Sequence, residues 1–548
     1  MDKRNLTKLF LIVFLAAAIR IGYLTYAPPS LNWDEVSHGY NAYSVLKTGM
    51  DEWGQKFPLI NFRAYGDYPT PLNLYLTIPF IAVLGLNELS IRSPHAFLGI
   101  LTIVSIYFLV FGLTKRKNLA LLSAFLAAIS PWYLFTSRFV VQSNLSVFLL
   151  TSSMAFFFNR EHKKYFLNIS LALLFLTLFS YHTTRIFSPL LLVGIILNYR
   201  SEILKKWVFL ILFFISSFVI LLNPNAQARS GVLSILGEGA INRIETLRNT
   251  SKLAPIVSKV IYNRPVYFAS QFIKNYISYF SPEFLFFKGG TQYQFSVPNT
   301  GLLYLINLPF FYIGLLFLIR KSLREKDFRL ILWWILLYPI PASLTNEKFA
   351  VIRATTILPI SELVTALGMY AFLDMFAKQK TLLLALFYII NLICLGGYLK
   401  NYFVDYRNDY SWSWQYGYKE VVNFAQSNYD SYDKIIITKK YGEPHEFLLF
   451  YTSWNPAMYI KDPNLNRFYQ SGWYWVDGFD KFYFVNDWDV AKYSDKFILE
   501  SKKTVSCQKG VERCLLITSP GNKPAKWRKM KTVNFLDNKP AFEMYSNI

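Results

Sequence analysis

Long apolar runs, separated by short charged segments, fill the first 400 residues of the chain. A helix needs about 20 predominantly apolar residues to cross a bilayer, and most of these runs approach that length. The pattern therefore predicts a multi-pass helical membrane protein with about eleven crossings. The expected helices cover residues of about 6–27, 94–114, 119–135, 142–159, 165–180, 186–199, 207–222, 301–319, 329–344, 354–376 and 381–399.

Residues 72–86 are also apolar, but they are short for a crossing. Counting them as one would move the basic segment Lys115-Arg116-Lys117 to the other side of the membrane. We therefore expect a surface helix or a partly inserted helix there. Two segments, residues 28–93 and 223–300, are expected to form outer loops that carry short amphipathic helices.

Basic residues gather in the short segments between the apolar runs. The chain has 548 residues and a formal net charge of +23, and six of these segments hold 19 Lys and Arg residues against five acidic residues. This is the positive-inside pattern of cytoplasmic loops, and it argues against nucleic acid as a partner. With a cytoplasmic N-terminus, an odd number of crossings places the C-terminal part outside the cell membrane.

The composition changes after residue 400, where the long apolar runs stop. We expect a membrane domain over residues 1–400 and a soluble extracytoplasmic α/β domain over residues 401–548. Its tryptophans fit a packed core, a membrane-interface belt or a surface that stacks on sugar rings. The expected buried strands are residues 434–438, 481–485 and 514–518, and the expected helix is residues 418–427.

Cys507 and Cys514 flank a short segment of this C-terminal domain. If the domain lies in an oxidising compartment, the two thiols are placed to form a disulfide. Cys394 lies inside an apolar run and is expected to be an inert core residue.

Two adjacent acidic residues, Asp34 and Glu35, follow the first apolar run. Asp34 suits a helix N-cap because its carboxylate can accept a hydrogen bond from a free backbone N–H. Gly49 suits the end of the same helix. We therefore expect a short amphipathic helix on the membrane surface. Either Asp34 only caps this helix and Glu35 is only solvated, or the two acids are catalytic groups.

Cations stand near the outer ends of several expected helices, where each either anchors its helix or binds an anion. A lipid-linked phosphate needs such cations, and Arg meets phosphate with a bidentate fork. A nearby carboxylate would then be able to deprotonate a hydroxyl acceptor. These cations are Arg92, Arg138, Arg185, Lys348 and Arg353.

Several short motifs resemble those of the GT-C glycosyltransferases, in particular the protein O-mannosyltransferases and aminoarabinose transferases. Trp33-Asp34-Glu35 is similar to their acidic motif after the first helix. The resemblance covers roughly residues 5–440. The other motifs are Asp67-Tyr-Pro-Thr-Pro-Leu72, Ile91-Arg92-Ser-Pro94, Ser130-Pro-Trp132 with Ser137-Arg138, Tyr181 with Arg185 and Pro189, and Trp414-Gln-Tyr-Gly-Tyr-Lys-Glu420.

The resemblance implies a GT-C fold in a prokaryotic cell membrane and an inverting transfer of sugar from a polyprenyl-phosphate donor to an outer-face hydroxyl. Asp34 would be the general base, and Glu35 would position the acceptor or tune Asp34. The acceptor would be a protein, a lipid or a polysaccharide. Arg92 would hold the donor phosphate, helped by Arg138, Arg185, Arg353 or Lys348, and the substrate contacts would include Asp67, Tyr68, Tyr181 and His182.

The sequence departs from the family pattern in two places. Thr70 replaces the first Pro of the Pro-Pro-Leu motif, and residues 346–353 lack the Pro-His pair of relatives. With the second change, Lys348 is the alternative cation to Arg353. Some relatives use a divalent ion, and Glu35 and His38 share a helix face that could contribute ligands. The chain has five histidines and they do not cluster, so we expect no structural metal site.

Three other functions fit the same sequence. A transporter or flippase for polyprenyl-linked glycans would place charges at mid-membrane and show internal repeats. The charges here fall at helix ends and no repeat is visible, which favours an enzyme. A non-catalytic assembly subunit and a ligase that transfers a preassembled oligosaccharide remain alternatives.

Overall fold

The chain divides into two compact units, each formed from separate stretches of sequence. The computed structural model describes residues 3–225, 234–237, 239–470 and 473–548. The first unit comprises Met1–Gly22 and His95–Leu399, and the second comprises Tyr23–Pro94 and Lys400–Ile548. The expected first outer loop, residues 28–93, therefore belongs to the same unit as the C-terminal domain.

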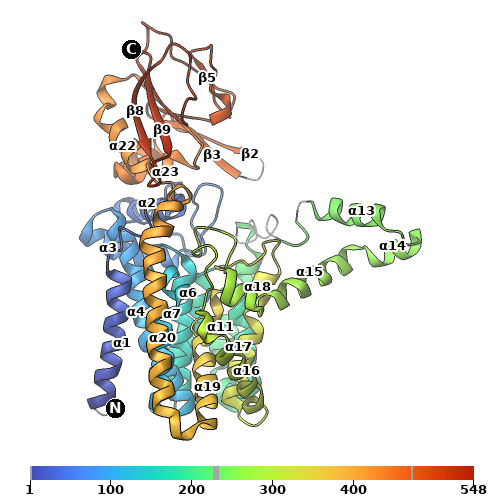
Figure 1. Cartoon of the computed structure of the whole chain (residues 1–548). Coiled ribbons are helices and arrows are strands. Elements are labelled where there is room, and N and C mark those ends of the chain that lie inside the picture. The colour runs from blue at the N-terminus through green and yellow to red at the C-terminus, as the bar shows by residue number, and fades with distance from the viewer. Residues whose placement is uncertain (1–2, 226–233, 238, 471–472) are drawn as a thin grey trace. The chain divides into compact units, whose positions relative to one another are not determined.

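The first unit is built from long apolar helices that run side by side (Figure 1). Among the described residues, four helical segments are long and apolar enough to cross a membrane: Glu88–Thr114, Arg200–Leu222, Leu305–Ser322 and Lys380–Asp409. The predicted helical membrane fold is confirmed, while the number of crossings stays a prediction. The main helices are α1 (Lys3–Ile21), α4 (Glu88–Thr114), α5 (Lys117–Ile129), α7 (Gln142–Phe158), α8 (Phe166–Leu176), α9 (Thr184–Asn198), α11 (Trp207–Leu222), α16 (Leu308–Ser322), α17 (Lys326–Leu337), α19 (Ile360–Met375) and α20 (Lys380–Lys400).

Two expected helices are each divided by a proline. The run expected over residues 119–135 ends as α5 at Ile129, and α6 (Pro131–Thr136) begins afresh. The run expected over residues 329–344 becomes α17 and α18 (Pro339–Ser343). Proline lacks the N–H that would continue the helical ladder, which makes it fit the first turn of a new helix.

Helices α16 and α19 approach each other closely through two glycines. A Cβ added at Gly314 would lie 1.9 Å from the Val364 carbonyl oxygen, and one added at Gly368 would lie 1.7 Å from that of Phe310. Small residues at facing positions let two helix backbones meet, a device typical of helix packing in membranes.

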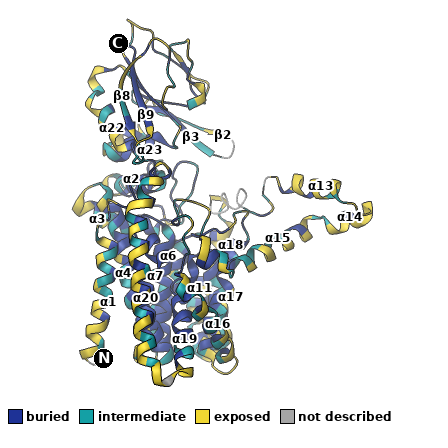
Figure 2. Cartoon of the chain, viewed as in Figure 1, coloured by how far each residue is buried: buried dark blue, intermediate teal, exposed yellow. Residues whose placement is uncertain are grey.

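The second outer loop, expected over residues 223–300, contains short helices as predicted. They are α13 (Ala240–Thr250), α14 (Pro255–Ile261) and α15 (Arg264–Ser278). Exposed residues run along α14 and α15 (Figure 2). Residues 226–233 and 238 of this loop lie outside the described part of the chain.

The second unit contains a seven-stranded sheet with the order β2-β3-β4-β1-β7-β9-β8. Its three predicted buried strands are confirmed as β1 (Lys434–Thr438), β4 (Phe482–Val485) and β7 (Cys514–Thr518), and β1 pairs in parallel with both others. The predicted helix is α22 (Tyr418–Ser427). The remaining strands of this sheet are β2 (Asn466–Gln470), β3 (Trp473–Phe479), β8 (Arg528–Asn534) and β9 (Pro540–Ser546).

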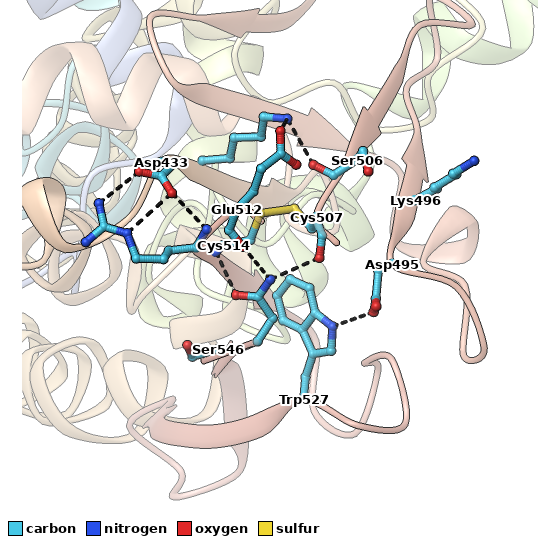
Figure 3. Close-up of a disulfide and its surroundings, with 12 residues drawn as sticks. Asp433, Asp495, Lys496, Ser506, Cys507, Glu512, Cys514, Trp527 and Ser546 are labelled. Atoms are coloured by element: carbon cyan, nitrogen blue, oxygen red, sulfur yellow. Dashed lines mark hydrogen bonds and ion pairs between the residues drawn. A yellow bond between two sulfur atoms is a disulfide. The ribbon is translucent and has the colours of Figure 1, made fainter. Parts of the chain in front are cut away.

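A disulfide joins Cys507 to Cys514, both fully buried (Figure 3). The Asn547 side chain ties the bridged segment to the end of the chain. Its amide nitrogen donates to the Cys507 carbonyl at 3.0 Å, and its oxygen accepts from the Cys514 backbone at 2.8 Å. The expected thiol pairing therefore forms at the start of β7, whose first residue is Cys514, while Cys394 is free and half-buried.

Candidate functional site

The acidic motif begins helix α2 (Trp33–Thr48), but the N-cap is Asn32, not Asp34 as the sequence predicted. The Asn32 side chain accepts a hydrogen bond from the Glu35 backbone at 2.9 Å, and the Asn32 backbone donates to Glu35 Oε2 at 3.3 Å. This reciprocal capping box satisfies two backbone donors at once. The predicted stop is confirmed, since Gly49 ends the helix with φ of 71°.

Because Asn32 caps the helix, the Asp34 carboxylate is left in the first turn for other contacts. The Tyr65 hydroxyl donates a hydrogen bond to Asp34 Oδ1. Asp34 is half-buried, whereas Glu35 beside it is fully buried. Asp34 thus lies at the N-terminal end of a helix, where the helix dipole favours a negative charge.

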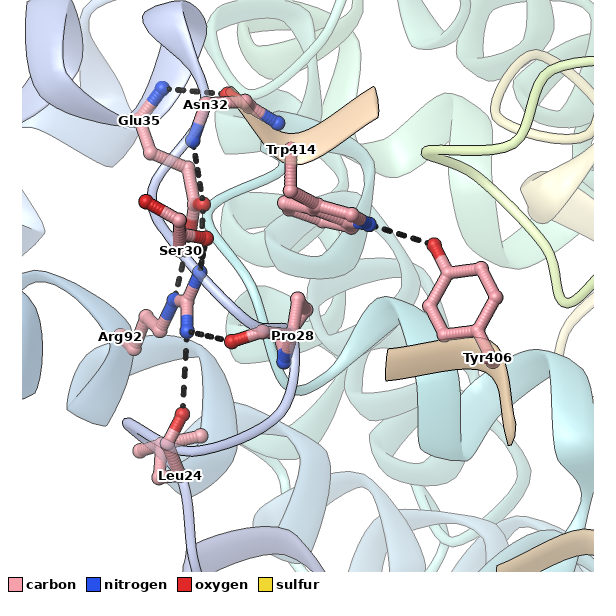
Figure 4. Close-up of polar contacts among 8 residues, drawn as sticks. All are labelled: Leu24, Pro28, Ser30, Asn32, Glu35, Arg92, Tyr406 and Trp414. Atoms are coloured by element: carbon pink, nitrogen blue, oxygen red, sulfur yellow. Dashed lines mark hydrogen bonds and ion pairs between the residues drawn. The ribbon is translucent and has the colours of Figure 1, made fainter. Parts of the chain in front are cut away.

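Glu35 and Arg92 form a buried ion pair (Figure 4). Arg92 Nε donates to Glu35 Oε1 at 2.9 Å, and Nη2 donates to Oε2 at 2.8 Å. The same guanidinium donates to three backbone carbonyls, those of Leu24 at 3.2 Å, Pro28 at 3.1 Å and Ser30 at 2.6 Å. A buried ion pair needs such additional hydrogen bonds to offset its desolvation.

These contacts describe the surroundings of Glu35 and Arg92, whose expected roles stay predictions. Arg92 is fully buried, and it donates to Glu35 and to the three carbonyls. Glu35 is fully buried and is paired with Arg92. The pair joins the start of α2 to α4 and to the segment that precedes α2.

Trp414, from the last of the sequence motifs, lies beside this ion pair. The Arg92 guanidinium carbon is 6.0 Å from the centre of the Trp414 ring. The Trp414 indole N–H donates to the Tyr406 hydroxyl at 2.6 Å (Figure 4). Trp414 is fully buried, so this motif residue has a packing role.

Asp67 and Tyr68, expected as substrate contacts, lie in the loop before α3 (Leu72–Leu84). Asp67 is buried, and its backbone exchanges two hydrogen bonds with Ala64, at 3.0 and 3.1 Å, which close a tight turn. Tyr68 is half-buried and its ring centre is 5.9 Å from the Arg63 guanidinium carbon. Asp67 therefore shapes the loop that presents Tyr65.

The other expected cations belong to the first unit. Arg138 is fully buried and donates to the Ile19 and Arg20 carbonyls at 2.5 and 3.0 Å. Arg353 forms an ion pair with Glu347, and Lys348 is exposed beside the Phe349 ring.

The Tyr181-His182 motif and Arg185 also lie in the first unit. Arg185 donates to the Leu178 carbonyl at 3.2 Å and lies 3.2 Å from His182 Nδ1. Tyr181 packs against His182 with ring centres 6.3 Å apart. The structure therefore brings three of the expected residues together around the start of α9.

A cluster of buried ionisable residues in the second unit was not foreseen from the sequence. His445 Nε2 lies 3.5 Å from Glu446 Oε1, and its Nδ1 lies 3.4 Å from Glu443 Oε2. Burial raises the pKa of Glu446 to about 8, and the nearby Asp34 charge adds to this effect. Burial also raises the pKa of Glu52 well above its usual value. Glu443, His445 and Glu446 lie more than 400 residues from Asp34 in sequence, so no local motif connects them.

Within the described residues, no group of three or more His, Cys, Asp and Glu side chains is arranged to hold a metal ion. The two residues considered for a divalent ion have other partners. Glu35 pairs with Arg92, and His38 Nε2 lies 3.0 Å from the Thr77 hydroxyl.

Residues 10–183 match the model of the family described as dolichyl-phosphate-mannose-protein mannosyltransferase. The matched range includes Asp34, Tyr65 and Arg92. It confirms the resemblance of this part of the chain to a GT-C glycosyltransferase family. Among curated proteins, none matches the chain.

Three solved structures are similar to this chain. The archaeal oligosaccharyltransferase AglB from Archaeoglobus fulgidus, in complex with an inhibitory peptide and a dolichol-phosphate, has 14% identity and a TM-score of 0.49 over 82% of this chain and 63% of that chain. ArnT from Cupriavidus metallidurans, bound to undecaprenyl phosphate, has 10% identity and a TM-score of 0.40 over 99% of this chain and 97% of that chain. The S. cerevisiae Pmt1-Pmt2 complex bound to the sugar donor has 18% identity and a TM-score of 0.25 over 53% of this chain and 36% of that chain. The present chain thus spans less than two thirds of the length of the oligosaccharyltransferase.

Proposed function

We propose that the protein is a membrane glycosyltransferase that moves a sugar from a polyprenyl-phosphate donor to a hydroxyl acceptor, with Asp34 as the general base. The observation that carries the proposal is the contrast between the two adjacent acids. Glu35 is buried and paired with Arg92, whereas Asp34 is half-buried and accepts a hydrogen bond from Tyr65. The family match over residues 10–183 supports the class of reaction.

In the proposed reaction, the Asp34 carboxylate takes the proton of the acceptor hydroxyl. The hydroxyl oxygen attacks the anomeric carbon of the donor sugar and the bond to the phosphate oxygen breaks. The phosphate leaves with the electron pair, and the configuration at the sugar carbon is inverted. Negative charge grows on the leaving phosphate, so cations placed there bind the transition state better than the ground state.

The donor-phosphate role is proposed for Arg92, helped by Arg138, Arg185, Lys348 or Arg353. Lys348 is exposed and Arg353 is half-buried, so their side chains reach solvent. Arg185 is buried beside His182, and Arg138 is buried and donates to two backbone carbonyls. Donor binding by single Gln variants of Arg138, Arg185, Lys348 and Arg353 tests each residue separately. Addition of a chelator to the same samples tests whether a divalent ion assists donor binding.

We also propose that the C-terminal domain lies outside the cell membrane. The disulfide between Cys507 and Cys514 supports this, because structural disulfides persist in oxidising compartments. The positive-inside pattern of the charged segments supports the same sidedness.

The test is transfer of labelled sugar from a panel of polyprenyl-phosphate monosaccharides to membrane acceptors, with the full chain in lipid. Asp34→Asn keeps the side-chain size and removes the base, and Asp430→Asn is the matched control because Asp430 is exposed. We expect transfer to fall by about a hundredfold or more in Asp34→Asn, the scale of a lost general base, and to stay unchanged in the control. Equal transfer by Asp34→Asn and the wild type would remove Asp34 from the chemistry. Donor binding without any transfer would favour a transporter or a binding subunit.

A further inference from the structure

The hairpin of β2 and β3 places Trp473 on the loop that presents Tyr65. The rings of Trp473 and Tyr65 have centres 5.7 Å apart. A Cβ added at Gly66 would lie 2.0 Å from the Trp473 ring. The indole therefore rests directly on the backbone of Gly66, where no larger residue fits without displacement.

A second contact holds the same loop to the same hairpin. The rings of Trp53 and Tyr474 have centres 5.2 Å apart. The Arg63 guanidinium carbon contacts both rings, at 3.5 Å from the Tyr474 ring centre and 4.0 Å from that of Trp53. Because Trp473 and Tyr474 are consecutive strand residues, they point to opposite faces of β3. The loop thus contacts both faces of the hairpin.

The loop passes this restraint to Asp34 through the Tyr65 side chain. The Tyr65 ring packs against Trp473, and the Tyr65 hydroxyl donates to Asp34 Oδ1. Tyr65 is buried, and Ala64 and Asp67 close the tight turn around it. The position of the hydroxyl is therefore set by the packing of the ring.

We propose that Trp473 of the C-terminal domain is a positioning residue for Asp34, acting through Tyr65. This inference rests on the proposed function of Asp34 as the base. Tyr65 fixes the rotamer of the carboxylate and stabilises its charged form, because a hydrogen bond donated to a carboxylate favours ionisation. Trp473 fixes Tyr65, so the hairpin is a structural part of the active site as well as part of an appended domain.

The test uses the full chain in lipid nanodiscs and four variants. Trp473→Ala removes the support, Trp473→Phe restores an aromatic ring, and Tyr65→Phe removes only the hydroxyl. Trp488→Ala is the matched control, because Trp488 belongs to the same domain and is 82% exposed. Two readouts are needed: hydrogen exchange of the peptide covering residues 60–68, and kcat, KM and the pH–rate profile of sugar transfer.

We expect Trp473→Ala to raise hydrogen exchange in residues 60–68 and to lower kcat by roughly 10- to 100-fold, the scale of a misplaced catalytic group. The KM for the donor should change little, and the acid limb of the pH–rate profile should move to higher pH. Tyr65→Phe should reproduce the change in kcat and in the acid limb, Trp473→Phe should restore most of the rate, and Trp488→Ala should behave as the wild type.

Three results would overturn the inference. The first is unchanged exchange of residues 60–68 in Trp473→Ala. The second is a wild-type kcat and pH profile in Trp473→Ala despite raised exchange. The third is a wild-type rate in Tyr65→Phe, which would remove the link between the ring and the base.

Two further outcomes are decided by additional measurements. If Trp473→Ala loses protection throughout the domain, Gly66→Ala replaces it, because the added methyl group displaces the indole from the loop side and leaves Trp473 in place. Gly66→Ala is then judged by the same criteria. If the wild type transfers no sugar, the proposed function fails, and the exchange experiment alone decides whether Trp473 orders the loop.

Discussion

The Arg92 guanidinium meets the Glu35 carboxylate through two hydrogen bonds of 2.9 and 2.8 Å, in a position where both side chains are shielded from solvent. This pair gives two adjacent acids different surroundings. Glu35 is held within the second unit as the partner of a buried cation, and Asp34 is the acid that retains exposed surface.

Glu35→Gln should destabilise the protein strongly. The variant leaves the Arg92 charge buried without its counter-ion, and breaking a buried pair in this way costs about 3–5 kcal/mol. Thermal unfolding of the protein in lipid, followed by tryptophan fluorescence, should show a clearly lower midpoint. The change keeps the size of the side chain, so lost packing contributes little.

The matching control is a double-mutant cycle with Arg92→Met. If the two side chains interact as described, the double variant should be less destabilised than the sum of the single variants, because no unpaired charge remains. Simple additivity of the two effects would contradict the pairing.

Glu446 should make the stability of the second unit depend on pH. Burial raises its pKa from 4.5 to about 8, so the folded state binds a proton that the unfolded state releases. Between these two values the unfolded state holds fewer protons, and the free energy of unfolding must fall as the pH rises. Glu52, whose pKa is also raised by burial, acts in the same direction, whereas burial lowers the pKa of His445.

The measurement is the unfolding midpoint between pH 6.5 and 8.5, above the usual pKa of 6.5 for histidine, where His445 contributes little. Glu446→Gln resembles the neutral carboxyl group and should flatten the pH dependence. Glu420→Gln, at an exposed position, should leave the dependence unchanged. An equal slope in the wild type and Glu446→Gln would show that Glu446 does not stay protonated in the fold.

Local patterns along the chain were sufficient to predict most elements of the fold. Apolar runs gave the helices of the first unit within a few residues, as in α7 and α20, and three short apolar runs gave the central strands. Two expected crossings are each divided into two helices, because Pro131 and Pro339 each begin a new helix. The strands β2, β8 and β9 lack a continuous apolar run and were not foreseen. The strand β3 was not foreseen either, although it begins with four apolar residues.

The site was harder to predict because its contacts join distant parts of the chain. Asp34 was found from its place after the first apolar run, but the cap was assigned to the wrong residue, since Asn32 is an equally good cap. The Glu35–Arg92 pair spans 57 residues, and Trp473 lies more than 400 residues from Tyr65. Periodicity and motif spacing report on neighbours along a helix or strand, not on such pairs.

Removal of the disulfide should weaken the C-terminal domain. Cys507 and Cys514 close a loop with a sequence separation of 7, and a cross-link of this size restricts the unfolded chain by about 2–3 kcal/mol. A Cys507→Ala/Cys514→Ala variant should unfold at a lower temperature, and a reducing agent should lower the midpoint of the wild type in the same way. Cys394→Ala is the control, because that thiol is free. A midpoint unaffected by reduction would mean that the bridge contributes nothing to stability.

The close approach of α16 and α19 predicts that a single methyl group at their contact will be costly. In Gly368→Ala the new Cβ would lie 1.7 Å from the Phe310 carbonyl oxygen, so the two helices must separate. Overpacking of this kind costs about 1–3 kcal/mol, and the variant should unfold faster than the wild type in detergent. Gly396→Ala in α20 is a matched control, because nothing lies within 4 Å of its added Cβ. Alanine is favoured over glycine in a helix by about 0.5–1 kcal/mol, so this control should unfold no faster than the wild type. Similar unfolding rates for the two variants would show that the helices do not pack through Gly368.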